Sequence, residues 1–87
     1  MITDKRVAQE VSEKLLKASF LMNQSMLLVQ EKCSEGELHV LREGLSKAMA
    51  ELLLEVLNPL YQEHPDLAPE GLRVPPKASF QQRPNNT

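Results

Sequence analysis

Apolar side chains recur at steps of three and four residues along the first third of the chain, which is the period of an amphipathic α-helix. The positions that define this stripe are Ala8, Val11, Leu15, Ala18, Met22, Ser25 and Val29. The pattern predicts a first helix, with Thr3 as its N-cap. The small residues at positions 8, 18 and 25 are expected to let a neighbouring helix approach closely.

A second helical stripe follows after a short polar segment. Its apolar positions are Leu38, Leu41, Leu45, Ala48, Leu52 and Val56, widened by Met49, Leu53, Leu57 and Leu60. Its start is marked by "SEGE", a capping box in which Ser34 and Glu37 exchange hydrogen bonds. Only two or three residues around Cys33 remain as a connection, so the sequence predicts an antiparallel two-helix hairpin of the all-α class.

Proline divides the chain unevenly, because all six prolines lie at or after Pro59. At Pro59 the second helix either kinks and continues to about residue 63, or ends so that Asn58 caps a short new helix. We expect the kinked helix, which His64 and Pro65 then stop. The chain thus reads as a helical body, residues 1–64, and an extended or disordered tail, residues 65–87. Order is expected to reach about Leu72 and to fade after Pro76.

The stretch "SFLMNQSMLLVQ", residues 19–30, carries apolar side chains in nearly every direction around a helix axis. A hairpin covers only one stripe of each helix, and a large exposed apolar patch is unusual for a monomer. We therefore expect dimerisation into a four-helix bundle. The predicted interface residues are Leu15, Met22, Met26, Val29, Leu45, Leu52 and Val56. The alternative is that the tail folds back, with Leu67, Leu72 and Val74 as plugs.

The composition limits the possible folds and locations of the protein but does not indicate a function. A chain of 87 residues forms one domain at most, and Cys33 has no partner for an intrachain disulfide. The N-terminal segment lacks the apolar core of a secretory signal, so a cytoplasmic location is expected. The uncharged window from Ala18 to Gln30 is shorter than the ~20 residues that span a bilayer, so we expect no membrane insertion.

The net charge of −2 hides an asymmetry between the two helices. The first carries nearly balanced charge, whereas residues 35–64 hold six glutamates against two basic residues. We expect exposed pairs that set the orientation of the hairpin rather than its stability. These would join Lys14, Lys17 and Arg6 to Glu51, Glu55 and Glu63. No Lys/Arg cluster forms a stripe suited to phosphates, so nucleic-acid binding is not expected.

Candidate chemistry is sparse. Glu35, His39 and Glu43 follow each other at i, i+4 and i+8 and form a weak metal-site candidate. Cys33 lies among glutamates that oppose thiolate formation, so it reads as a small apolar group in the corner, and His64 reads as a surface residue. No nucleophile turn, phosphate loop or cofactor motif is present, and we expect no enzyme and no cofactor.

The distal tail offers a possible recognition motif. The segment "RVPPKASFQQRP" combines Pro75 and Pro76 with a single aromatic residue, Phe80, among basic side chains. Such a segment can adopt a polyproline II helix and bind an aromatic groove. A simple disordered end is the alternative.

These observations favour a non-enzymatic helical interaction protein, in the manner of an adaptor, regulator or co-chaperone, that works as a homo-oligomer and binds another protein. The architecture is similar to that of small helical-hairpin dimers, some of which bind RNA. The first alternative is therefore an RNA-binding hairpin dimer that uses Lys5, Arg6, Lys14 and Lys17. The second is a metal-binding bundle.

Overall fold

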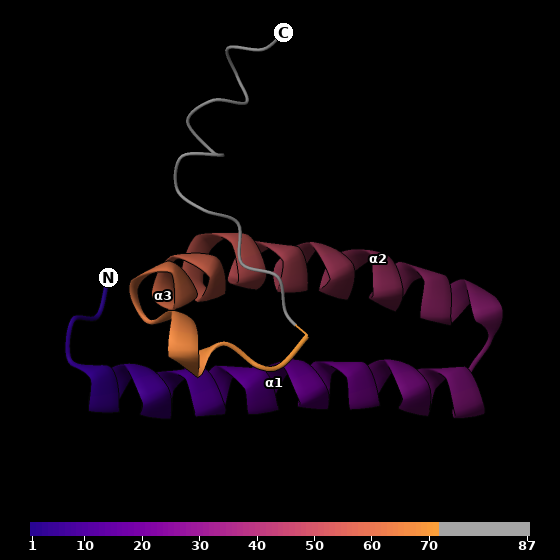
Figure 1. The fold of residues 1–87 in the computed structure, drawn as a ribbon. Helices are drawn as coiled ribbons and strands as arrows, with labels where there is room; N and C mark the ends of the chain where they lie inside the picture. The colour runs from indigo at the N-terminus through magenta and orange to yellow at the C-terminus, as the bar shows by residue number, and fades with distance from the viewer. Residues whose placement is uncertain (72–87) are drawn as a thin grey trace, which may run out of the picture.

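The computed structural model describes residues 1–71, and this part of the chain is all-helical, without a strand. Helix α1 (Lys5–Lys32) and helix α2 (Glu35–Leu52) lie against each other as an antiparallel hairpin (Figure 1). A π-helical turn, η1 (Leu53–Leu57), joins α2 to the short helix α3 (Asn58–Glu63), and a 3-10 turn, η2 (Pro65–Leu67), follows. The predicted fold class and hairpin are therefore confirmed.

Helix α1 begins one residue later than the sequence suggested. Its N-cap is Asp4, whose Oδ1 accepts a hydrogen bond of 3.1 Å from the Val7 N–H, so the choice of Thr3 was wrong. A carboxylate at this position also lies next to the positive end of the helix dipole, an interaction that a threonine hydroxyl does not provide. The 28 residues of α1 make a rod about 42 Å long.

The hairpin tip has the predicted form. Only Cys33 and Ser34 separate the two helices, and the capping box is complete. The Glu37 N–H donates to Ser34 Oγ at 3.2 Å, and the Ser34 N–H donates to Glu37 Oε1 at 3.0 Å. The hydrogen bonds from the Ser34 backbone and hydroxyl hold the pKa of Glu37 below its usual value. Two residues between helices leave no room for any arrangement but an antiparallel one.

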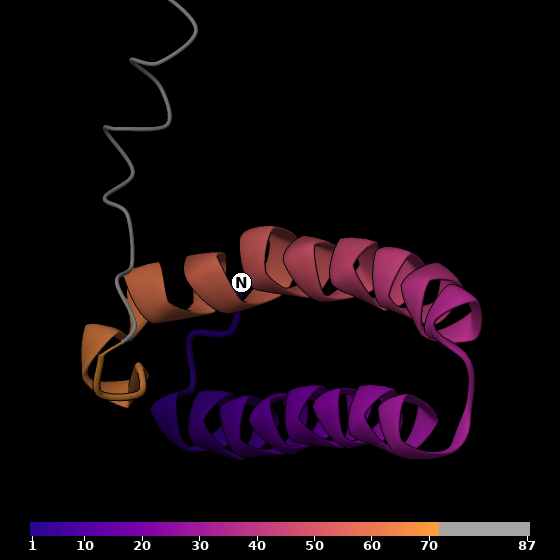
Figure 2. The same ribbon diagram turned by 90° about the vertical axis from the view of Figure 1, so that its right-hand side faces the viewer.

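The second helical arm, which consists of α2, η1 and α3, continues through Pro59. This agrees with the expectation of a kinked helix. Asn58 has helical backbone angles (φ −61°, ψ −48°), and no side-chain hydrogen bond caps α3. Proline at position 59 has no N–H for the carbonyl of residue 55, and its ring crowds that carbonyl. The wider π turn relieves this crowding, because the Asn58 N–H bonds the Leu53 carbonyl five residues back. Figure 2 shows the resulting curvature of the arm.

The π turn also moves the buried face by one residue. An uninterrupted α-helix would continue the α2 stripe through Leu52 to Val56. Instead Leu57 is buried and Val56 is half-buried, because the extra residue in the turn rotates everything after it. The face that α3 turns inward therefore carries Leu57, Leu60 and Tyr61.

The core lies at the open end of the hairpin, where α3 packs on the first half of α1. Ala8, Leu60 and Tyr61 have no exposed surface, and Leu57 keeps 4%. The Ser12 and Tyr61 hydroxyls are hydrogen-bonded to each other inside this core. Seven partly buried apolar residues surround it: Ile2, Leu15, Leu16, Leu52, Leu53, Leu67 and Ala68. Ala8, one of the three small residues expected to let a neighbouring helix approach, lies in this core with Leu60 and Tyr61, whereas Ser25 is exposed.

Away from this end the hairpin is much more open. Between residues 17 and 50, Leu38 is the only buried residue. The side chains that α1 and α2 turn toward each other in this region are half-buried, and Figures 1 and 2 show the two helices arching apart between the tip and the core. Within residues 1–71 the buried cluster is therefore confined to the open end of the hairpin.

The expected ion pairs across the hairpin do not form. Within residues 1–71 the ion pairs are Met1–Glu63, Lys5–Asp66 and His39–Glu43. The helical period explains the difference, because it places Lys17 opposite Ala8 on the surface of α1, facing away from α2. Lys17 therefore cannot reach the glutamates of the second arm.

One buried side-chain atom in the part of the chain that the structure describes has no hydrogen-bond partner. Asn58 is 3% exposed, and its Oδ1 atom accepts no hydrogen bond. An unpaired buried amide oxygen costs about 1–3 kcal/mol. The unpaired atom therefore lowers the stability of the fold locally, at the residue that links the π turn to α3.

Alanine substitutions test the position of the core. Leu60→Ala should lower the free energy of unfolding by about 2–5 kcal/mol, because Leu60 is fully buried and the cavity cannot collapse completely. Leu54→Ala, at a position that is 51% exposed in the same arm, should change it by only about 0.5 kcal/mol. Urea denaturation followed by circular dichroism measures both. Equal effects of the two substitutions would contradict the position of the core.

Candidate functional site

The largest group of exposed, large apolar side chains in the described chain lies on α1. Phe20 is 59% exposed, Leu28 54%, Leu21 53% and Leu27 50%. With a period of 3.6 residues, these four side chains and the exposed Gln24 share one face of the helix. We call this face, made of Phe20, Leu21, Gln24, Leu27 and Leu28, the outer α1 patch. It lies on the side of α1 opposite the stripe that contains Ala8.

The interface residues predicted from the sequence lie elsewhere. All seven are half-buried on the inner faces of the hairpin: Leu15, Met22, Met26, Val29, Leu45, Leu52 and Val56. Leu15 and Leu52 pack against the core of the same chain. Their role in a dimer stays a prediction. The outer α1 patch contains none of the predicted interface residues, although the apolar residues all around the helix between positions 19 and 30 were the signal for it.

The second arm has no comparable patch. Its exposed large apolar residues are Val40, at 72%, and Leu54, at 51%. They lie fourteen residues apart on α2 and η1, with glutamates and Lys47 between them. The two helices of the hairpin thus differ, since the outside of α2 is largely polar and the outside of α1 is apolar over two turns.

The basic residues proposed for RNA binding do not form a continuous surface. Lys5 is paired with Asp66, and Arg6, Lys14 and Lys17 are exposed. Helical spacing places Glu10 and Glu13 on the same outward side as Arg6 and Lys17. Alternating charges of this kind give no positive stripe for a phosphate backbone. The arrangement favours the protein-interaction hypothesis over the RNA-binding alternative.

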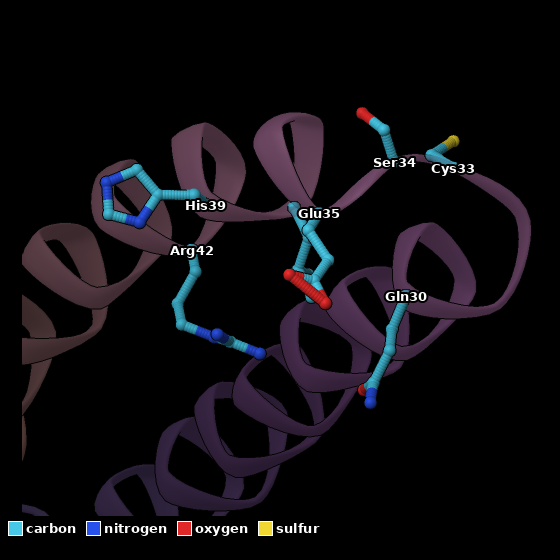
Figure 3. A pocket seen from close by; sticks show the side chains of 7 residues that line it. Gln30, Cys33, Ser34, Glu35, His39 and Arg42 are labelled. Carbon is cyan, nitrogen blue, oxygen red and sulfur yellow. The ribbon is translucent and has the colours of Figure 1, made fainter.

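A hollow of about 570 Å³ lies at the hairpin tip (Figure 3). It is lined by Gln30, Cys33, Ser34, Glu35, Leu38, His39 and Arg42. In Figure 3 the side chains of Glu35 and Arg42 extend toward α1, whereas those of Cys33 and Ser34 point the other way. Cys33 lies at the corner between the helices, where a small apolar group was expected, and its side chain is exposed.

The weak metal candidates do not assemble into a site. His39 Nε2 lies 3.8 Å from Glu43 Oε2, and both side chains are largely exposed. In the part of the chain that the structure describes, no three His, Cys, Asp or Glu side chains form a group that could hold a metal ion. Glu35 therefore does not join the other two in one set of ligands.

A polar clamp ties the N-terminal segment to the end of α3. The Met1 amino group donates to Glu63 Oε1 at 2.9 Å, and Lys5 is paired with Asp66. His64 Nε2 lies 2.6 Å from the Ile2 carbonyl oxygen. A carbonyl can only accept, so this ring nitrogen carries a proton. His64, expected at the surface, is half-buried, and its ring is hydrogen-bonded to the Ile2 carbonyl oxygen.

Two of these acidic groups have lowered pKa values. The hydrogen bond from the N-terminal amino group holds the pKa of Glu63 below its usual value, and the hydrogen bond from Lys5 does the same for Asp66. Both side chains remain partly exposed, so solvent weakens these interactions. The clamp mainly fixes the position of the N-terminus over the core.

The beginning of the predicted tail packs against the body. Leu67 and Ala68 lie against the core cluster, so residues 65–68 belong structurally to the hairpin. This agrees with the expected anchoring by Leu67. Leu72 and Val74, the other expected anchors, and the motif residues Pro75, Pro76 and Phe80 lie outside the described residues.

Two further findings concern membrane crossing and similarity to known proteins. None of the helices in residues 1–71 is long and apolar enough to cross a membrane. Comparison with known proteins gives no relative: no protein-family model, curated protein or solved structure matches the chain.

The clamp predicts a dependence of stability on pH. Glu63 and Asp66 have lower pKa values in the folded state, so their contribution is present above the unfolded pKa values and disappears as pH falls through the folded ones. The melting temperature should therefore fall between about pH 5 and about pH 3. The double variant Glu63→Gln/Asp66→Asn should show a shallower fall.

Thermal melts followed by circular dichroism at several pH values measure this difference. The control is Glu10→Gln/Glu51→Gln, which removes the same number of carboxylates at exposed positions away from the clamp. If the control flattened the profile as much as the clamp variant, the clamp would not be the cause.

Proposed function

We propose that this protein is a non-enzymatic helical interaction protein that works as a homo-oligomer, with a dimer that forms a four-helix assembly. The outer α1 patch is the observation that carries this proposal. Four large apolar side chains that are half or more exposed gather on two turns of one helix. Contiguous apolar surface of this kind typically marks a protein interface.

The small core supports the same proposal. Buried residues gather at the open end of the hairpin, and the middle of the seam is only half-covered. Small domains bury a low fraction of their surface and often gain stability by association. A second copy would bury apolar area on α1 without any further sequence.

We further propose that the dimer acts in the cytoplasm and binds another protein, with the distal tail as the recognition element. The single cysteine fits a reducing compartment. Anchoring of Leu67 and Ala68 on the core gives the tail a fixed origin on the body. The motif residues Pro75, Pro76 and Phe80 are of the types that bind aromatic grooves.

Sedimentation equilibrium at micromolar concentration tests the assembly. A mass of twice 9.8 kDa is expected, because the exposed apolar groups of α1 leave water on association. A mass of 9.8 kDa at all concentrations up to about 100 µM, where even a weak dimer would form, would remove the homo-oligomer from the proposal.

Quantitative affinity capture from the native host tests the tail. The wild-type chain, the triple variant Pro75→Ala/Pro76→Ala/Phe80→Ala, and a control variant with Gln81→Ala/Gln82→Ala serve as baits. The triple variant should lose the captured protein, since it lacks the rigid prolines and the aromatic anchor, whereas the control should keep it. Equal capture by all three baits would exclude the tail motif as the binding element.

A further inference from the structure

We propose that a second copy of this chain packs antiparallel along the outer α1 patch, with the twofold axis of the dimer at Gln24. The inference rests on the proposed homo-oligomer and adds the surface, the direction and the register of the contact. It places the two α1 helices at the centre of the assembly and the two α2 helices on the outside.

The spacing of the patch is symmetric about Gln24. Counted outward from this residue, the positions three residues away are Leu21 and Leu27, and those four residues away are Phe20 and Leu28. An antiparallel copy reverses the order of these positions about the axis. Phe20 of one copy then lies beside Leu28 of the other, and Leu21 lies beside Leu27. A surface that matches its own reversed copy is what a twofold interface requires.

The charges at the ends of the patch select the direction. Seven residues before Gln24 is Lys17, and seven residues after it is Glu31. Both are exposed and lie on the same face as the patch. In an antiparallel pair each Lys17 meets Glu31 of the other copy, whereas a parallel pair brings like charges together at both ends. Charge complementarity of this kind fixes orientation and register.

The polar residue at the centre fits the same geometry. Gln24 is exposed, and its side-chain amide has both a donor and an acceptor. On a twofold axis two such amides can pair with each other. A single polar residue inside an apolar helix contact is a known way to specify one register.

The surroundings of the patch favour a second copy over another part of the hairpin. The hairpin itself uses the opposite stripe of α1, where Met22 and Met26 are half-buried, so residues 20–28 carry apolar side chains on both faces. A helix segment that is apolar all round is normally buried. The outer face of α2 is largely polar and offers no second large patch, so the matching apolar surface is the same patch on another copy.

The first experiment measures the dimer dissociation constant of the full chain by sedimentation equilibrium. Leu21→Glu should weaken the dimer by at least about tenfold, because the symmetric contact buries the new charge twice. Val40→Glu is the matched control: it places the same charge at an exposed apolar position of α2, and it should leave the constant unchanged.

Charge reversal tests the direction. Lys17→Glu and Glu31→Lys should each weaken the dimer, and the double variant Lys17→Glu/Glu31→Lys should restore it, since opposite charges then meet again. In a parallel dimer the single reversals would change little, because each would replace one like-charge contact with another. That result would overturn the antiparallel arrangement.

Disulfide trapping in a Cys33→Ser background tests the register. Gln24→Cys should form a crosslinked dimer rapidly under mild oxidation, because the two thiols face each other at the axis. Lys17→Cys should not, because an antiparallel pair separates its two copies by about 21 Å along the helices. Efficient crosslinking at position 17, or none at position 24, would overturn the proposed register.

The outcomes separate this inference from the proposed function. A wild-type monomer, as expected if residues 72–87 of the same chain cover the patch, would overturn both. A wild-type dimer that Leu21→Glu leaves intact would overturn the inference alone, because the homo-oligomer would then use another surface. A dimer that responds to the patch variants, to the charge swap and to trapping at position 24 is the result expected.

Discussion

The packing of Leu60 and Tyr61 on Ala8 is the interaction on which the rest of the structure depends. It joins residues about fifty positions apart and contains the only fully buried large side chains of the described chain. The Ser12–Tyr61 hydrogen bond satisfies the one polar group that Tyr61 brings into this core. Because the middle of the hairpin is half-open, the relative position of α1 and the second arm is set mainly here and at the two-residue tip.

The π turn makes this packing available. Pro59 has no backbone N–H to donate, and its ring crowds the carbonyl one turn earlier. The π turn before it is wider than an α-helical turn and so accommodates both effects. The extra residue also rotates α3, so that Leu57, Leu60 and Tyr61 face α1 together. The unpaired Oδ1 of Asn58 is a local cost of this arrangement. The polar clamp from Met1 and Lys5 then closes the same end of the molecule over the core.

Because the core lies at one end of the hairpin, the two halves of α1 have different surroundings. Its first half holds the intramolecular core, with charged residues on the outside. Its second half has half-buried residues inside and the outer α1 patch outside. Lys17 and Glu31 bound the apolar part on either side. The proposed second copy would cover the apolar outer face of this second half, which the small core of one chain leaves exposed.

The sequence by itself determined the features that depend on neighbours a few residues away. Helical periodicity, the Ser34–Glu37 capping box and the short connection at Cys33 predicted the hairpin, and the apolar run from 19 to 30 predicted an excess of uncovered surface. Even among local features, the choice between adjacent caps was missed, because Thr3 and Asp4 both suit the role.

Only the tertiary structure decided the register of α3 and the composition of the core. The burial of Tyr61 could not be predicted from the residues near it in sequence. It depends on Ala8 and Ser12, which are about fifty positions away in the chain. The shift from Val56 to Leu57 follows from the π turn, which an unbroken period of 3.6 residues cannot anticipate. The clamp on Glu63 and the hydrogen bond of His64 likewise join residues more than sixty positions apart. Local patterns fix which segments are helical, whereas contacts between distant segments fix which side of each helix is buried.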